Sequence, residues 1–357
     1  TLSPGGAEEP ALEIPLTPAA SPTESPPLLY YTQAGDTLEV VAVRFGVEPE
    51  EIQSPDPLVQ GVLFNPNQLL IIPNRLVNTT SPQKLIPDSE VVFSPSAVDI
   101  DLEAFVKEQG GYLSTYREWL GMTEWTPGAS VVYRVALENS INPRLLLAIL
   151  EYQSGWVSGT PGNLVVQKYP LGRIETNEDG LYQQLAWAVN QLSIGYYGWR
   201  EGRLTEIKFL DGVSARLAPD LNAGTVALQY YFAQVYDTQG WVQALDPERG
   251  FPALYERLFG SPWVRALEVE PLYPPDLVQP NFILPFITGQ LWSYTGGPHG
   301  AWEHDGAMAA LDFAPAGDRS GCTETNAWVV AIAPGQVVRS ENGVVLVDLD
   351  GDGLEQT

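Results

Sequence analysis

Two proline-rich tracts divide this chain into segments that must fold separately. Residues 1–29 combine Pro, Ser, Thr, Ala and Glu with few large apolar side chains, and residues 76–100 form a second stretch rich in Pro and Ser. Proline fixes its own φ angle and has no amide hydrogen, so it interrupts helices and central strands. Segments this poor in apolar residues also bury too little surface to fold alone. We therefore expect a disordered linker over 1–29, a second linker over 76–100, and a multidomain protein.

The charge of the chain narrows the classes of partner. Its 357 residues carry a net charge of −26, which repels nucleic-acid phosphates and anionic lipid surfaces. We therefore expect no nucleic-acid partner, whereas neutral polysaccharides and cations remain possible partners. No run of about 18 apolar residues occurs, so no transmembrane segment is expected. The first residue, Thr1, is consistent with removal of a signal or lipoprotein leader, and we expect an exported, extracellular or cell-surface protein.

The segment 30–75 has the pattern of a small βααβ unit. Tyr30–Thr32 reads as a short strand, and Asp36 or Thr37 can cap a following helix. Apolar residues then recur at helical spacing, at Leu38, Val41, Ala42 and Phe45. Gly46 is placed to end that helix with a left-handed cap. A second short helix near residues 49–53 and a closing strand within 67–73 complete the predicted order.

This unit resembles a LysM module. The resemblance is carried by Gly-Asp-Thr-Leu at residues 35–38, Phe-Gly-Val at 45–47 and Ile-Pro at 72–73. Modules of that family bind N-acetylglucosamine-containing glycans between the first strand–helix loop and the loop before the last strand. The resemblance implies peptidoglycan as the partner. It also implies a glycan-binding set of six residues, which are Gly35, Asp36, Thr37, Leu38, Asn67 and Gln68. The chain departs from the family in having Ser-Pro-Asp-Pro at 54–57 and Asn67 where glycine is usual.

Residues 101–268 read as a helical domain. Asn142 caps a helix with Pro143 at its first position, and long helical stretches are expected over residues 181–197 and 223–236. The helix beginning at Pro143 resembles the first catalytic helix of lysozyme-like lytic transglycosylases. That family has its general acid immediately before a serine, where this chain has Gln153, and an amide has no proton to give. Glu151 is the remaining candidate acid, but it lies about 200° around the helix from Gln153. The alternatives are a working glycosidase, a glycan-contacting scaffold and a helical spacer.

The last segment, 269–357, has the alternating β-branched runs and Pro/Gly punctuation of a β domain, including runs at 328–333 and 344–347. Gly-Gly-Pro-His-Gly at 296–300 and Leu-Asp-Phe-Ala-Pro at 311–315 make it resemble the lysostaphin group of zinc endopeptidases, in the staphylolysin branch. The resemblance implies that His299 and Asp312 are the first two zinc ligands. It also implies that a later His-x-His motif completes the site, a motif that these residues lack. We therefore expect an antiparallel peptidase sheet that is incomplete at Thr357, and an inactive fragment.

The sequence contains two further candidate metal arrangements. His304 is the second of the chain's two histidines and is an alternative zinc ligand. The run Asp348, Asp350, Asp352 with Gly351 and Gly353 matches the first half of a calcium-binding loop, and the alternative is a solvated acidic turn. The single cysteine, Cys322, either pairs outside these residues or is a free thiol.

Together these features predict a multidomain α+β protein that is exported, binds peptidoglycan, and acts as a zinc metalloendopeptidase on wall peptides when its metal site is complete. Zinc is the expected cofactor, with calcium as a further candidate. The rival hypotheses are a non-catalytic wall-binding scaffold or activator, and a glycan-cleaving middle domain.

Overall fold

The computed structural model describes most of the chain. The described residues are 26–121, 124–176, 178–273, 280–299, 310–317, 325–341, 343–349 and 351. The expected linker over 1–29 therefore lies almost wholly outside them, as do His304, Cys322, Asp350 and Asp352. Over the described residues the fold mixes helices with small two-stranded antiparallel sheets, which confirms the α+β class.

The first module has the predicted order of elements. It comprises β1 (Leu28–Tyr31), α1 (Leu38–Phe45), the 3₁₀ helix η1 (Pro49–Glu51) and β2 (Leu69–Ile72). Thr37 is the N-cap of α1 and accepts a hydrogen bond from the Val40 amide, while Gly46 ends the helix at φ 67°. The apolar face of α1 packs on the β1–β2 pair and forms a separate small core. The capping and spacing predictions for this helix are confirmed.

The helical body follows. Its helices are α2 (Leu102–Gln109), α3 (Gly128–Glu138), α4 (Pro143–Ser154), α5 (Leu164–Lys168), α6 (Leu181–Arg200), α7 (Ala223–Ala233), α8 (Thr238–Ala244), α9 (Phe251–Phe259) and α10 (Pro262–Val269). Three short 3₁₀ helices are also present, η2 (Asp88–Glu90), η3 (Pro95–Ala97) and η4 (Tyr112–Ser114). Two hairpins complete it, β3 (Arg117–Trp119) with β4 (Trp125–Pro127), and β5 (Glu206–Lys208) with β6 (Ser214–Arg216).

Helix α4 lies at the centre of this body. Its residues from Leu145 to Leu150 are all fully buried, as expected for a helix that is apolar on every side. The predicted Asn142 cap is confirmed, because its side chain accepts a hydrogen bond from the Arg144 amide and Pro143 is the first helical residue. Helices α6 and α7 pack along each other, and Gly195 lets the Cα of Ala227 approach closely.

The expected linker over 76–100 is corrected in its second half. Ile86 and Val91 are buried in the core of the helical body, Ala97 is buried in η3, and η2 and η3 pack against α10. Two of the prolines that suggested a linker, Pro87 and Pro95, occupy the N-cap of η2 and the first turn of η3, where no amide hydrogen is needed. The helical body therefore begins well before residue 101.

The C-terminal residues form two antiparallel hairpins. One pairs β7 (Trp292–His299) with β8 (Ala310–Pro315), and the other pairs β9 (Gln336–Glu341) with β10 (Val344–Asp348). The expected strand over 328–333 is reduced to one isolated bridge between Phe286 and Val329. The run at 344–347 is a strand as predicted. Among the helices of the described residues, none combines the length and apolarity needed to span a bilayer.

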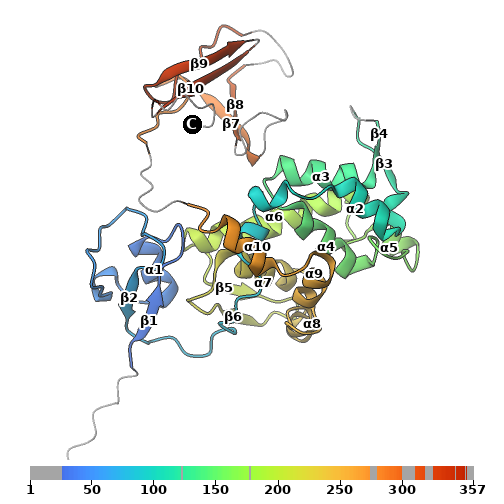
Figure 1. The fold of residues 1–357 in the computed structure, drawn as a ribbon, viewed down its shortest axis with the longest axis horizontal. Coiled ribbons are helices and arrows are strands. Elements are labelled where there is room, and N and C mark those ends of the chain that lie inside the picture. The colour runs from blue at the N-terminus through green and yellow to red at the C-terminus, as the bar shows by residue number, and fades with distance from the viewer. Residues whose placement is uncertain are drawn as a thin grey trace, which may run out of the picture.

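The first module lies against one side of the helical body, beside the β5–β6 hairpin (Figure 1). Arg216 of β6 donates hydrogen bonds to the carbonyl oxygens of Val43 and Arg44 at 3.0 Å each. Thr79 and Thr80 also bond to the backbone of β6 and the residues after it. The two bodies are therefore joined by direct contacts as well as by the connecting chain.

Candidate functional site

The loop between β1 and α1 is built around the buried carboxylate of Asp36. Its Oδ1 lies 2.7 Å from Nη1 of Arg44, and its Oδ2 accepts hydrogen bonds from the Tyr30 hydroxyl and the Gln33 amide. Asp36 and Arg44 are only 2% and 3% exposed. Burial, reinforced by the charge of Asp36, raises the pKa of Tyr30. Asp36 thus holds the loop in shape from inside the module.

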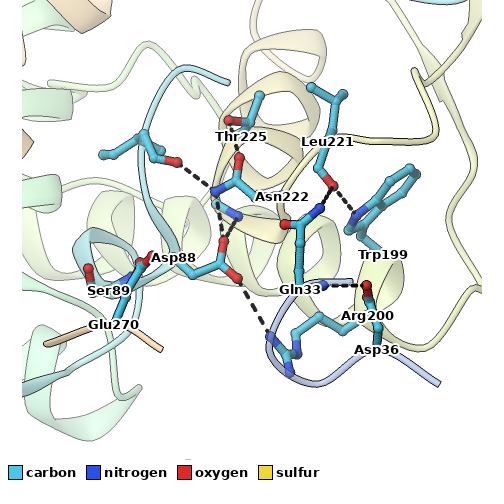
Figure 2. Close-up of polar contacts among 12 residues, drawn as sticks. Gln33, Asp36, Asp88, Ser89, Trp199, Arg200, Leu221, Asn222, Thr225 and Glu270 are labelled. Carbon is cyan, nitrogen blue, oxygen red and sulfur yellow. Dashed lines mark hydrogen bonds and ion pairs between the residues drawn. The ribbon is translucent and has the colours of Figure 1, made fainter. Parts of the chain in front are cut away.

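The same arginine connects this loop to the helical body. Nε and Nη2 of Arg44 both donate to the carbonyl oxygen of Trp199 at 3.2 Å, and the guanidinium carbon lies 4.7 Å from the Trp199 ring centre. The side-chain amide of Gln33 donates to the carbonyl oxygens of Asp220 and Leu221, and the Trp199 indole donates to the same Leu221 oxygen (Figure 2). These bonds fix the loop onto the start of α7.

Gly35 lies at the tightest point of this contact. Its φ angle is +85°, and a Cβ placed there would lie 1.5 Å from Nη2 of Arg200. Arg200 in turn lies 3.6 Å from Oδ2 of Asp88. Glycine is therefore required twice over, by the backbone conformation and by the guanidinium packed against it.

A cavity of about 400 Å³ opens beside this contact, and we call it the junction pocket. Its module wall is Thr32, Gln33, Ala34, Pro66 and Asn67. Its wall from the helical body is Lys84, Asp88, Asn222, Trp263, Leu267, Glu270, Pro271 and Leu272. The pocket therefore combines a partly exposed indole and aliphatic groups with amide, ammonium and carboxyl groups, which is the usual lining of a small-molecule site.

The two carboxylates of the junction pocket have different surroundings. Oδ1 of Asp88 accepts hydrogen bonds from the Asn222 side chain at 2.8 Å and the Gly224 amide at 2.7 Å, in addition to its Arg200 partner. Oε1 of Glu270 accepts one bond from the Ser89 amide at 2.9 Å (Figure 2). Desolvation, reinforced by the charge of Asp88, raises the pKa of Glu270 despite that bond. Glu270 therefore holds its proton more readily than an ordinary glutamate.

The six predicted glycan-binding residues are placed differently from one another. Asn67 lines the junction pocket, at φ 69°. The backbone amide of Gln68 donates to Oγ1 of Thr32 and anchors the loop, and Thr37 caps α1. Leu38 and Asp36 are buried within the module, and Gly35 faces Arg200. A ligand in the pocket thus meets Asn67 among the predicted set.

Sequence patterns did not point to Gln33 or to the pocket wall that the helical body supplies. Gln33 has only its position beside the Gly-Asp-Thr-Leu motif as a signal, and its partners Asp220 and Leu221 are 187 and 188 residues away. Trp263 and Glu270 lie on and just after α10, where the sequence shows an ordinary amphipathic helix. Contacts between residues so far apart in the chain produce no local sequence pattern from which they could be predicted.

The second candidate site lies on the β7–β8 hairpin. Strand pairing sets Gly296 opposite Asp312, and His299 opposite Ala310, so the two predicted zinc positions lie on adjacent strands. Carboxylate oxygen and imidazole nitrogen are both zinc donors, and a catalytic zinc takes three protein ligands. Among the described residues, no three His, Cys, Asp or Glu side chains cluster as a metal site. The two donors fit zinc, but a third is needed to complete the set.

The candidate acid of the middle domain is engaged in local structure. Oε2 of Glu151 accepts bonds from the amides of Val157 and Ser158 at 2.9 and 3.0 Å, and Oε1 accepts the Ser158 hydroxyl. Gln153 accepts a bond from the Tyr236 hydroxyl at 2.9 Å. Glu151 thus organises the turn that follows α4.

The predicted calcium run is described only in part. Asp348 is buried at the end of β10, and its Oδ1 accepts a hydrogen bond from the Gly351 amide at 2.7 Å. Such a bond closes the turn after the strand and is compatible with either a cation-binding loop or a plain acidic turn. Calcium binding stays a prediction.

These features define a multidomain α+β protein whose helical body carries a βααβ module on one side and leads into β-hairpins. A family model described as LasA, N-terminal domain, matches residues 84–273, more than half of the chain, and the chain therefore belongs to that family. The family is tied to staphylolysin-like peptidases. The matched range coincides with the helical body, whose core begins at Ile86. Neither the curated proteins nor the solved structures contain a match to the chain.

Proposed function

We propose that this chain is part of an exported zinc metalloendopeptidase that binds peptidoglycan and cleaves its peptides. The observation that carries the proposal is the pairing of β7 with β8, which sets His299 and Asp312 on adjacent strands in a chain of a staphylolysin-related family. When bound, zinc would supply a Lewis acid and activate a water for attack on the peptide bond. His299 and Asp312 would hold the metal, and a His-x-His motif absent from these 357 residues would complete its ligands.

Hydrolysis of purified peptidoglycan tests this function. The complete gene product is expected to clear a suspension of peptidoglycan and release new amino termini, to stop when a chelator removes zinc, and to recover when zinc is restored. Release of reducing sugar ends without new amino termini would contradict the peptidase proposal. It would support the glycan-cleaving alternative instead.

The first module supports a wall-binding role in this proposal. Its elements follow the βααβ order that the LysM resemblance implies, and Asn67 of the expected glycan loop lines an open cavity. We propose that this module binds N-acetylglucosamine-containing glycan and holds the protein on the wall. Co-sedimentation of the chain with insoluble peptidoglycan checks this part separately, because it needs no zinc.

A non-catalytic wall-binding scaffold is the second candidate. The engagement of Glu151 with Val157 and Ser158, together with the amide at Gln153, supports a middle domain that performs no glycosidic cleavage. Retention on peptidoglycan by a complete gene product that lacks both zinc and hydrolytic activity would favour the scaffold. Zinc-dependent hydrolysis would exclude it.

A further inference from the structure

The junction pocket has two walls that belong to different bodies. Thr32, Asn67 and their neighbours come from the βααβ module, whereas Lys84, Trp263 and Glu270 come from the helical body. The two walls are held in place by the Arg44–Trp199 and Gln33–Leu221 hydrogen bonds and by Arg200 packed on Gly35. A ligand that enters this cavity therefore contacts both bodies at once.

Several polar groups of the pocket have hydrogen-bonding capacity left over. The side chains of Asn67 and Lys84 make no hydrogen bond within the part of the chain that the structure describes, and both are exposed. Oε1 of Glu270 accepts a hydrogen bond from the Ser89 amide, and a carboxyl group with two oxygens can accept further hydrogen bonds. These groups offer an amide, an ammonium and a carboxyl group to a ligand from different directions.

One apolar face completes the lining. Trp263 is 41% exposed on α10 and lines the pocket together with Leu267 and Leu272. An indole face set among hydrogen-bonding groups suits a ring that is apolar on its faces and polar at its rim, which describes a pyranose sugar. Asp88 is paired with Arg200, and the ammonium group of Lys84 is offset by the carboxyl group of Glu270, so a neutral ligand fits the pocket better than an ionic one.

Another cavity among the described residues offers a comparison. It measures about 420 Å³ and lies beside Glu51 and Arg75, whose side chains pair with each other. None of its described lining residues is aromatic. It therefore lacks the stacking surface that distinguishes the junction pocket.

We propose that the junction pocket is a composite saccharide site, in which a neutral N-acetylated amino sugar stacks on Trp263 and hydrogen-bonds to Asn67, Lys84 and Glu270. This inference rests on the proposed glycan binding of the first module and adds the helical body as its second half. The limited volume of the pocket suits a short stretch or an end of a glycan strand. The helical body is then a recognition element for the wall as well as a connection between the module and the β-hairpins.

Titration calorimetry of the full chain with a soluble N-acetylglucosamine tetramer tests the composite site. Trp263→Ala is expected to weaken binding by about tenfold or more, because it removes the stacking surface. Asn67→Gly, which keeps the left-handed backbone conformation, is expected to weaken binding from the module side. Trp125→Ala is the matched control, since Trp125 is 61% exposed on β4, away from the pocket, and it is expected to bind like the wild type. Circular dichroism verifies that each variant is folded.

The possible outcomes distinguish failure of the composite site from failure of the proposed glycan binding. Weaker binding in both Trp263→Ala and Asn67→Gly, with Trp125→Ala unchanged, supports the composite site. Loss in Asn67→Gly with wild-type affinity in Trp263→Ala would overturn it and leave glycan binding to the module alone. If the wild type binds neither the tetramer nor insoluble peptidoglycan, the glycan-binding part of the proposed function fails as well.

Discussion

At the residue scale, the ion pair of Asp36 and Arg44 both fixes the conformation of the β1–α1 loop and holds that loop on the helical body. Replacing Arg44 by methionine leaves the buried Asp36 carboxylate without its cation, and the Trp199 carbonyl loses two donors. Breaking a buried ion pair in this way is expected to lower the free energy of unfolding by about 3–5 kcal/mol. Denaturant unfolding followed by tryptophan fluorescence measures the loss.

Arg75 provides the control for that substitution. It pairs with Glu51 at the surface and is 53% exposed, so Arg75→Met is expected to cost about 1 kcal/mol or less. Equal losses for Arg44→Met and Arg75→Met would contradict the structural role assigned to the buried pair.

Glu151 makes a second residue-scale prediction. Its carboxylate accepts three hydrogen bonds from Val157 and Ser158, so Glu151→Ala is expected to lower stability by about 1–3 kcal/mol. Because these bonds organise the turn after α4, the rate of peptidoglycan hydrolysis at a temperature where the variant is folded is expected to stay unchanged. A folded Glu151→Ala variant that no longer hydrolyses peptidoglycan would show that the residue is catalytic.

At the scale of an element, the β3–β4 hairpin is attached to α6 through Glu118. Oε2 of Glu118 accepts bonds from the Tyr182 amide at 3.0 Å and the Tyr116 hydroxyl at 3.3 Å. Desolvation raises the pKa of Glu118 even so, which means that folding favours its neutral form. Stability from this group is therefore complete at low pH and is lost as pH rises through its raised pKa.

Glu118→Gln tests the direction of this pH dependence, because glutamine imitates the neutral carboxyl group. The melting temperature of the variant relative to the wild type is expected to be higher at about pH 7 than at about pH 4, where the wild-type carboxyl is itself protonated. If the difference in melting temperature between Glu118→Gln and the wild type stays constant or shrinks as pH rises, the raised pKa of Glu118 is contradicted.

The elements also show which parts of the fold could be predicted from the sequence. Helices α1 and α4 could be predicted because their caps, Thr37 with Gly46 and Asn142 with Pro143, are local signals. The segment containing Ile86 and Val91 could not, because its burial depends on contacts with α7 and α10 far along the chain. The predicted strand near Val329 shortened to a bridge, since strand pairing depends on a partner that periodicity alone does not specify.

The candidate sites divide in the same way. His299 and Asp312 were predicted from sequence motifs, and strand pairing places them on adjacent strands, while their zinc binding stays a prediction. The junction pocket was only half found, through Asn67, because its other wall comes from residues of the helical body with no motif of their own. Docking between two bodies depends on both of their surfaces, so local sequence patterns do not predict it.

At the scale of the whole molecule, Gly35 controls whether the module stays docked. Gly35→Ala places a Cβ against the Arg200 guanidinium and strains a backbone at φ +85°, so we expect the module to separate from the helical body. Small-angle X-ray scattering is expected to show a larger radius of gyration, and proteolysis between residues 74 and 83 is expected to accelerate.

Gly61→Ala separates docking from backbone strain. Gly61 also has a positive φ, +69°, but a Cβ there meets nothing within 4 Å. Its substitution is expected to cost about 1 kcal/mol of stability without any change in scattering. If both variants expand equally, or neither does, Gly35 does not have the docking role that the structure assigns to it.

The zinc content of the complete gene product decides between the peptidase and the scaffold, and atomic absorption measures it on the wild type and on three single variants. The proposal predicts about one zinc per chain in the wild type, loss of that zinc in His299→Ala and in Asp312→Ala, and retention in His304→Ala. A wild-type protein without zinc, or zinc that persists in both His299→Ala and Asp312→Ala, would contradict the proposed peptidase.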